Sequence, residues 1–176
     1  MSDVERTYNV LFLCHRNSAR SIIGEALLNS LPHIPLRGFS AGSEPGERIH
    51  PLAAELLTSM HIPTHDLYPK HWDVFARDGA APMDLVFSVC DKTLGQTCPN
   101  WPGHPVTGHW GIEDPSQVDG DATMRRQAFR NALHAMRTRI QLLANLPIAS
   151  LDRMSLQSEV DAIGRLEAGN PVGTET

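Results

Sequence analysis

The sequence predicts an α/β fold with a mostly parallel, four-stranded sheet and helices on both faces. Short apolar runs at 8–13, 36–41 and 84–89 are typical of buried parallel strands. Longer segments with apolar residues at helical spacing alternate with these runs. Glycine and proline residues separate the two kinds of segment. In such folds ligands bind at the C-terminal ends of the strands.

The elements follow one another without an internal repeat. The strand at 8–13 leads through a loop at 14–21 into a helix that ends near residue 30. After the strand at 36–41, a helix begins with Pro51, because proline is tolerated in the first turn of a helix. The remaining predicted elements are a short helix near 71–76, strands at 84–89 and 106–110, a long helix at about 121–145 and an amphipathic helix at about 151–166.

The length of 176 residues favours one main domain. We expect this domain at 1–147. Residues 148–176 are expected to form a C-terminal helix and a disordered tail that pack on the domain or extend from it. The net charge of −5 does not suggest a nucleic-acid partner. No run approaches the ~20 apolar residues of a membrane span, and the first residues do not resemble a secretory signal. These features predict a cytoplasmic protein.

The loop at 14–21 carries the sequence Cys-His-Arg-Asn-Ser-Ala-Arg-Ser between a strand and a helix. Backbone N–H groups and a helix N-terminus converge on anions in such loops. A helix N-terminus also lowers the pKa of a thiol, which makes Cys14 a candidate nucleophile. Arg20 can bind two oxygens of a tetrahedral oxyanion, and Asn17 can adopt a left-handed conformation. The residues expected to contact the oxyanion are His15, Arg16, Asn17, Ser18, Ala19, Arg20 and Ser21.

Two further cysteines and an aspartate complete the candidate site. Cys90 directly follows the strand at 84–89, so it is expected at the same sheet edge as Cys14. Cys98 lies in a segment rich in glycine and proline. An odd number of cysteines argues against a purely structural disulfide framework. Asp114 can protonate a leaving oxygen, although an Asp-Pro pair is also a common turn.

The loop resembles that of the low-molecular-weight tyrosine phosphatase family. The longer pattern Phe-Leu-Cys-His-Arg-Asn-Ser-Ala-Arg-Ser, with the segments at 89–103 and 109–115, is similar to the arsenate reductases that share this fold. The resemblance implies reduction of arsenate to arsenite, for arsenic detoxification, through a thiol–arsenate adduct on Cys14. It implies that Cys90 attacks Cys14 and that Cys98 then attacks Cys90. Thioredoxin, or glutathione with glutaredoxin, would reduce the resulting disulfide.

The resemblance implies further properties of the site. Asp114 stands where related phosphatases keep their general acid, and the next-but-one residue, Ser116, replaces an aromatic residue of tyrosine phosphatases. This exchange favours a small inorganic substrate, with phosphate or sulfate as competitors. Many relatives have glycine in place of Arg16, which is compatible only if that position does not need a positive φ. No tightly bound cofactor is expected, but relatives can bind potassium, and the corresponding residues are Asn17, Glu25, Ser40, Thr64 and Asp66.

Several other interpretations remain open. A phosphomonoester hydrolase of the phosphatase type would need Cys14, Arg20 and Asp114 but neither of the other cysteines. Cys98 could be inert, with a Cys14–Cys90 disulfide resolved by glutathione. Zinc could bind Cys90, Cys98, His104 and His109, although the spacing lacks a tight Cys-x2-Cys motif. A non-enzymatic protein that senses oxyanions or metals is a further alternative.

Overall fold

The computed structural model of the chain describes residues 6–90 and 99–166. Four strands form one parallel sheet in the order β2-β1-β3-β4. Each strand begins and ends within one residue of its predicted bounds, and the predicted fold class is confirmed. The strands are β1 (Tyr8–Cys14), β2 (Leu36–Gly42), β3 (Leu85–Ser88) and β4 (Val106–His109).

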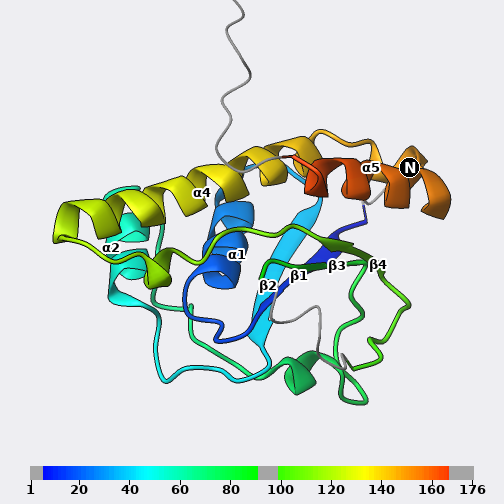
Figure 1. The fold of residues 1–176 in the computed structure, drawn as a ribbon. Coiled ribbons are helices and arrows are strands. Elements are labelled where there is room, and N and C mark those ends of the chain that lie inside the picture. The colour runs from blue at the N-terminus through cyan, green and yellow to red at the C-terminus, as the bar shows by residue number, and fades with distance from the viewer. Residues whose placement is uncertain (1–5, 91–98, 167–176) are drawn as a thin grey trace, which may run out of the picture.

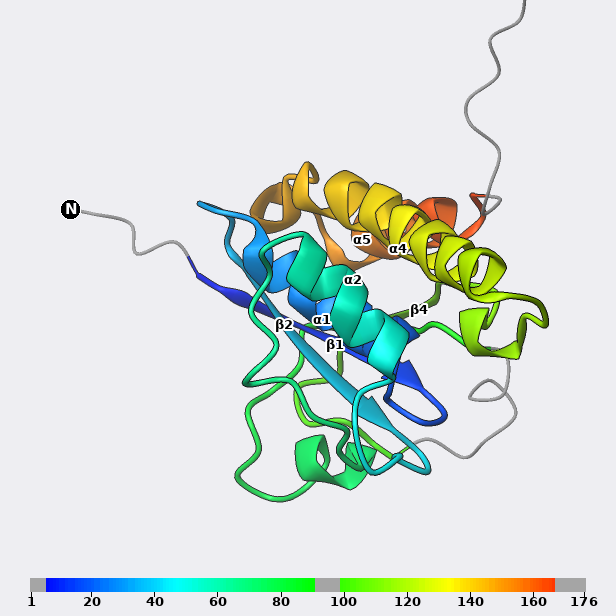
Figure 2. The ribbon, with the colours of Figure 1, turned by 90° about the vertical axis from the view of Figure 1, so that its left-hand side faces the viewer.

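Four α-helices cover one face of this sheet (Figures 1 and 2). Their apolar side chains pack in one cluster with Val10 and Phe12 of β1 and with Phe87 of β3. Trp110, which follows β4, is fully buried and stacks on Phe87 with ring centroids 3.8 Å apart. The helices are α1 (Arg20–Ser30), α2 (Pro51–Ser59), α4 (Ala122–Ala144) and α5 (Arg153–Gly164).

A short 3-10 helix, η1 (Trp72–Phe75), lies over the other face. Trp72 and Phe75 pack there against Leu11, Leu13 and Val86. Among residues 6–90 and 99–166, helical structure therefore covers both faces, as predicted, with the 3-10 helix η1 on the second face.

The C-terminal helices begin at side-chain caps and belong to the same core. Asp121 accepts a hydrogen bond from the N–H of Met124 at the start of α4, and Asp152 caps α5 in the same way. α5 packs on β4, and the Trp110 indole donates a 3.2 Å hydrogen bond to the carbonyl of Val160. The predicted disordered tail at 167–176 lies outside the described residues. Within residues 6–90 and 99–166, no helix combines the length and apolar character needed to cross a membrane.

Candidate active site

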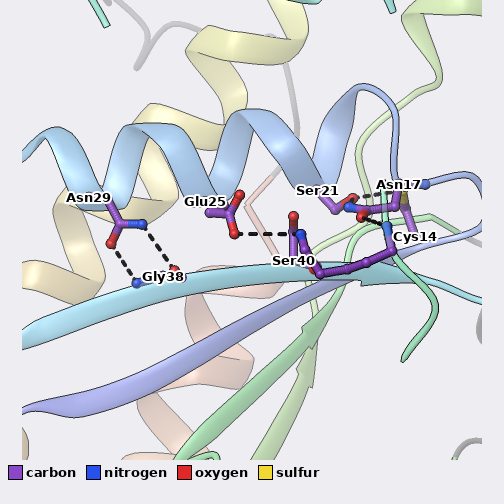
Figure 3. Close-up of polar contacts among 8 residues, drawn as sticks. Cys14, Asn17, Ser21, Glu25, Asn29, Gly38 and Ser40 are labelled. Atoms are coloured by element: carbon purple, nitrogen blue, oxygen red, sulfur yellow. Dashed lines mark hydrogen bonds and ion pairs between the residues drawn. The ribbon is translucent and has the colours of Figure 1, made fainter. Parts of the chain in front are cut away.

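Cys14 is the last residue of β1 and is 3% exposed. Its sulfur lies 2.9 Å from the hydroxyl oxygen of Ser21, in the first turn of α1 (Figure 3). The backbone N–H of Asn17 also points at the sulfur, with an N···S distance of 3.2 Å. Strand, loop and helix thus bring two donors to one thiol, as expected for a loop that activates a nucleophile.

Asn17 determines the direction of these hydrogen bonds. It is fully buried and has a φ of 49°, the left-handed conformation predicted for this loop. Its Nδ2 donates to the Ser21 hydroxyl at 2.8 Å, and its Oδ1 accepts from the backbone N–H of Lys70 at 2.9 Å. The Ser21 oxygen accepts from Asn17, so its own hydrogen stays available for Cys14, and it must be the donor once the sulfur is a thiolate.

A second segment, 42–50, holds the loop from outside. The φ angle of Arg16 is not positive, so a side chain at this position is compatible with the loop. Gly42 approaches the loop so closely that a Cβ atom there would lie 2.7 Å from the His15 carbonyl oxygen. Backbone N–H groups of the segment bond to loop carbonyls in four pairs: Ser43 to Cys14, Glu44 to His15, Gly46 to Arg16 and His50 to Ser18.

Opposing influences act on the Cys14 thiol. Burial is the largest and raises its pKa above the ordinary cysteine value of 9.0. The hydrogen bond from Ser21 lowers the pKa, the nearby Cys90 raises it, and the Arg20 charge lowers it. The net direction is opposite to the predicted lowering, because the end of β1 is deeply buried. Formation of the thiolate therefore depends on Ser21 and Arg20.

Arg20 and Asp114 lie together beside the loop. One guanidinium nitrogen of Arg20 donates to the Ile112 carbonyl at 2.9 Å, and another lies 3.2 Å from Oδ2 of Asp114. The other carboxylate oxygen of Asp114 accepts from both the N–H and the hydroxyl of Ser116. Asp114 therefore stabilises an Asp-Pro turn, the structural role that the sequence also allowed. Its other carboxylate oxygen still contacts Arg20. A cation and an acid are thus in direct contact next to Cys14.

Cys90 lies at the same sheet edge as Cys14. The N–H of Val89 donates to the Leu13 carbonyl at 2.8 Å, so the segment after β3 continues alongside β1. Cys90 is the next residue and is 2% exposed. Cys14 and Cys90 therefore lie at the C-terminal ends of two adjacent parallel strands. Cys98, the third member of the expected relay, lies outside the described residues.

The described residues of the alternative zinc site, Cys90, His104 and His109, do not form a metal-binding group. Within residues 6–90 and 99–166, no group of three or more His, Cys, Asp or Glu side chains could hold a metal ion. His109 Nδ1 lies 2.8 Å from the Ser88 hydroxyl, and His104 is exposed. Cys98, the fourth residue of this set, lies outside the described residues.

The residues expected to bind potassium only partly converge. Glu25 and Ser40 face each other between α1 and β2, close to Asn17 (Figure 3). The Asp66 side chain is 90% exposed and pairs with His65 at 3.2 Å, and the Thr64 carbonyl accepts from the N–H of Leu67.

The structure adds a residue that sequence reasoning missed. The ammonium group of Lys70 lies 3.1 Å from the Ser40 carbonyl and 3.9 Å from Oε1 of Glu25. The available signal was its rarity, since the chain has thirteen arginines but only two lysines.

The family model described as "Low molecular weight phosphotyrosine protein phosphatase" matches residues 9–157. The chain belongs to this family. "Arsenate reductase 1" of Bacillus cereus is 30% identical over 113 residues, which are 64% of this chain and 81% of that protein. "Glutaredoxin arsenate reductase" of Synechocystis is 28% identical over 134 residues, 76% of this chain and 94% of that protein. A solved arsenate reductase from Archaeoglobus fulgidus covers 78% of this chain and 99% of its own, with 28% identity and a TM-score of 0.61.

Proposed function

We propose that this chain reduces arsenate to arsenite for arsenic detoxification, with Cys14 as the nucleophile. The observation that carries the proposal is Cys90, a second buried thiol that follows the strand adjacent to β1, at the same edge of the sheet as Cys14. Hydrolysis of a phosphate ester needs no second thiol. Reduction needs a second thiol, which attacks the sulfur of the Cys14 adduct and forms a disulfide. The relatives named arsenate reductases, which share most of this chain's length, support the same reaction.

In the first step the Cys14 sulfur attacks the arsenic atom of hydrogen arsenate. The hydroxyl of hydrogen arsenate leaves as water; the one proton that it needs comes from Asp114, which regains it from the proton released by the Cys14 thiol. Loop N–H groups and the Arg20 guanidinium stabilise the negative charge on the other oxygens. The contact of 3.2 Å between Arg20 and Asp114 keeps cation and acid on the same side of the loop. The product is a Cys14 thiol–arsenate adduct.

In the second step the thiolate of Cys90 attacks the Cys14 sulfur. The sulfur–arsenic bond breaks and its electron pair stays on arsenic, which leaves as arsenite while Cys14 and Cys90 form a disulfide. Adjacent strands lie ~4.8 Å apart, a spacing compatible with the Cα separation of a disulfide. Cys98 then attacks Cys90, which frees Cys14 and forms a Cys90–Cys98 disulfide.

An external dithiol or thiol returns the two electrons. We propose thioredoxin, or glutathione with glutaredoxin, as the donor; the name of the Synechocystis relative supports the second. Such donors keep cysteines reduced in the cytoplasm, which is the location we propose.

The rival function is hydrolysis of phosphomonoesters. Cys14, Arg20 and Asp114 would suffice for it, and the family name favours it. In that reaction water attacks the adduct on Cys14, and no electrons move. The small, partly buried side chain of Ser116 offers no aromatic surface for a phosphotyrosine ring, which argues for an inorganic oxyanion.

One experiment separates the two functions. Arsenite formation is measured with thioredoxin and with glutathione plus glutaredoxin, for the wild type and for Cys14→Ser, Cys90→Ser and Cys98→Ser, alongside hydrolysis of p-nitrophenyl phosphate. We expect arsenite from the wild type only, or from Cys98→Ser as well if glutathione resolves the Cys14–Cys90 disulfide. If the wild type makes no arsenite and Cys90→Ser still hydrolyses the ester, the chain is a phosphatase.

A further inference from the structure

A row of polar contacts joins α1 to β2 and ends at Cys14 (Figure 3). At its far end, the Asn29 amide makes two hydrogen bonds with the backbone of Gly38. In its middle lies the Glu25 carboxylate, whose side chain is only 11% exposed. The nearest cation is Lys70, whose side chain is equally buried. Lysine side chains are rarely this buried unless they are paired, so solubility does not explain Lys70 at this position.

The surroundings of the Lys70 ammonium are those of a bound monovalent cation. It donates to the Ser40 carbonyl at 3.1 Å, lies 3.9 Å from Oε1 of Glu25, and sits 4.6 Å from the centre of the Tyr68 ring. Carbonyl and carboxylate oxygens are the ligands that hard cations prefer. The position that the resemblance assigns to a potassium ion therefore already contains a positive charge, and the exposed Asp66 does not complete a cage for a second one.

The same residue also fixes the loop through its backbone. The Lys70 N–H donates to Oδ1 of Asn17 at 2.9 Å, and its carbonyl accepts from the N–H of Gly42 at 2.9 Å. With Oδ1 occupied, the Asn17 amide turns its Nδ2 to Ser21, whose hydroxyl then points at the sulfur of Cys14. The ammonium anchors Lys70 between α1 and β2, and its backbone transmits that position to the nucleophile.

We propose that the Lys70 ammonium is the resident cation of this site, that it positions Asn17 and Ser21 for thiolate formation at Cys14, and that the chain needs no added potassium. This inference rests on the proposed function only in taking Cys14 as the nucleophile. It replaces the expected potassium ion by a side chain of the protein itself.

The energetics of the pair support a positioning role. Burial raises the pKa of Glu25 and lowers that of Lys70, while each charge partly opposes the shift of the other. Hydrogen bonds from the side chain and the backbone of Ser40 also lower the pKa of Glu25. Buried pairs of this kind often stabilise a fold no better than apolar side chains of similar size. The ion pair between Lys70 and Glu25 therefore contributes less to the free energy of unfolding than its burial suggests. Its role is to hold Lys70 in the position from which its backbone bonds to Asn17.

Three substitutions test this role. Lys70→Ala removes the charge and leaves a space, Lys70→Met removes the charge but fills the space, and Lys70→Arg keeps a charge. Arg126→Met, which breaks an exposed ion pair with Glu55, is the matched control for the loss of a cation. Folding of each variant is checked by circular dichroism and thermal unfolding.

The measurement is the rate at which iodoacetamide alkylates Cys14, read by peptide mapping at pH 7.5 in potassium, ammonium, sodium or choline chloride of equal ionic strength. We expect the wild type and Arg126→Met to react equally in all salts. Lys70→Ala should react about fivefold to tenfold more slowly in choline, which corresponds to one lost charge-assisted contact. Added potassium or ammonium should raise the alkylation rate of Lys70→Ala back towards the wild-type rate, and the effect should saturate with ion concentration. Lys70→Met should stay slow in every salt, and Lys70→Arg should remain within about threefold of the wild type.

The inference is overturned if potassium accelerates the wild type, if Lys70→Ala and Lys70→Met react like the wild type, or if Lys70→Ala is slow and equally so in all salts. The wild-type comparison tests the independence from potassium even if a variant fails to fold. Alkylation does not require turnover, so a wild type that makes no arsenite refutes the proposed function and leaves this test intact.

Discussion

Replacement of Ser21 by alanine removes the hydroxyl that lies 2.9 Å from the sulfur of Cys14. Both residues are buried, so water does not replace the lost donor. The substitution also leaves Nδ2 of Asn17 without the acceptor that it contacts at 2.8 Å. Two separate effects follow, one on the thiolate and one on the free energy of unfolding.

The effect on the thiolate is the difference between two hydrogen bonds. A hydrogen bond to a charged group contributes ~1.5–3 kcal/mol, and one between neutral groups ~0.5–1.5 kcal/mol. The anion of Cys14 therefore loses about 1.4 kcal/mol more than the thiol, which is about a tenfold smaller thiolate fraction. The buried amide of Asn17, left unsatisfied, lowers the free energy of unfolding by about 1–3 kcal/mol.

The assay is the pH dependence of Cys14 alkylation, together with denaturant unfolding of the same samples. We expect Ser21→Ala to react about tenfold more slowly below the pKa of Cys14 and to unfold more easily. Ser30→Ala, at the other end of α1, removes a hydroxyl that bonds only to the Leu27 carbonyl and should leave alkylation unchanged. An alkylation profile of Ser21→Ala identical to that of the wild type would refute the assigned direction of these hydrogen bonds.

Two other predictions concern the segment that supports the loop. Gly42→Ala places a methyl group 2.7 Å from the His15 carbonyl, and overpacking against backbone should lower the free energy of unfolding by about 1–3 kcal/mol, measured in urea; an unchanged midpoint would contradict this contact. His50 caps α2 by accepting from the N–H of Leu52, and burial, together with Arg125, lowers its pKa below the usual 6.5, whereas Asp114 raises it. This contribution to stability is therefore fully present above pH 6.5 and is lost as acid protonates the ring. His50→Asn keeps a cap and should remove this dependence; an equally steep fall in the variant would exclude His50 as its origin.

The parts of the site that sequence predicts are local in the chain. The Cys-x5-Arg spacing, the strand before it and the helix after it lie within 8–30, so their pattern specifies both the loop and its nucleophile. The left-handed Asn17 was predicted for the same reason, since few residue types adopt that conformation. Apolar spacing also predicted α4, whose buried face includes Phe129, Leu133 and Met136.

The parts that sequence does not predict depend on contacts between distant segments. Lys70 lies in a stretch without apolar periodicity, and only the folded chain brings it to Asn17, 53 residues earlier. The upward shift in the pKa of Cys14 arises from burial by the whole domain, whereas a motif describes only the nearby donors. The packing of η1 on Leu11 and Leu13 is likewise a contact between distant segments, and no local sequence pattern specifies it.

The four backbone hydrogen bonds from 43–50 to the loop have a consequence for the thermodynamics of anion binding. Ordering a residue costs ~1–2 kcal/mol of conformational entropy, and here that cost is met when the domain folds. An anion then enters a loop that is already shaped, so its affinity does not have to offset the ordering of the chain. By linkage, an oxyanion that binds only the shaped loop must slow amide hydrogen exchange at Ser43, Glu44, Gly46 and His50, whose N–H groups donate to the loop carbonyls. The slowing of hydrogen exchange at these four amides thus measures the affinity of the loop for an oxyanion.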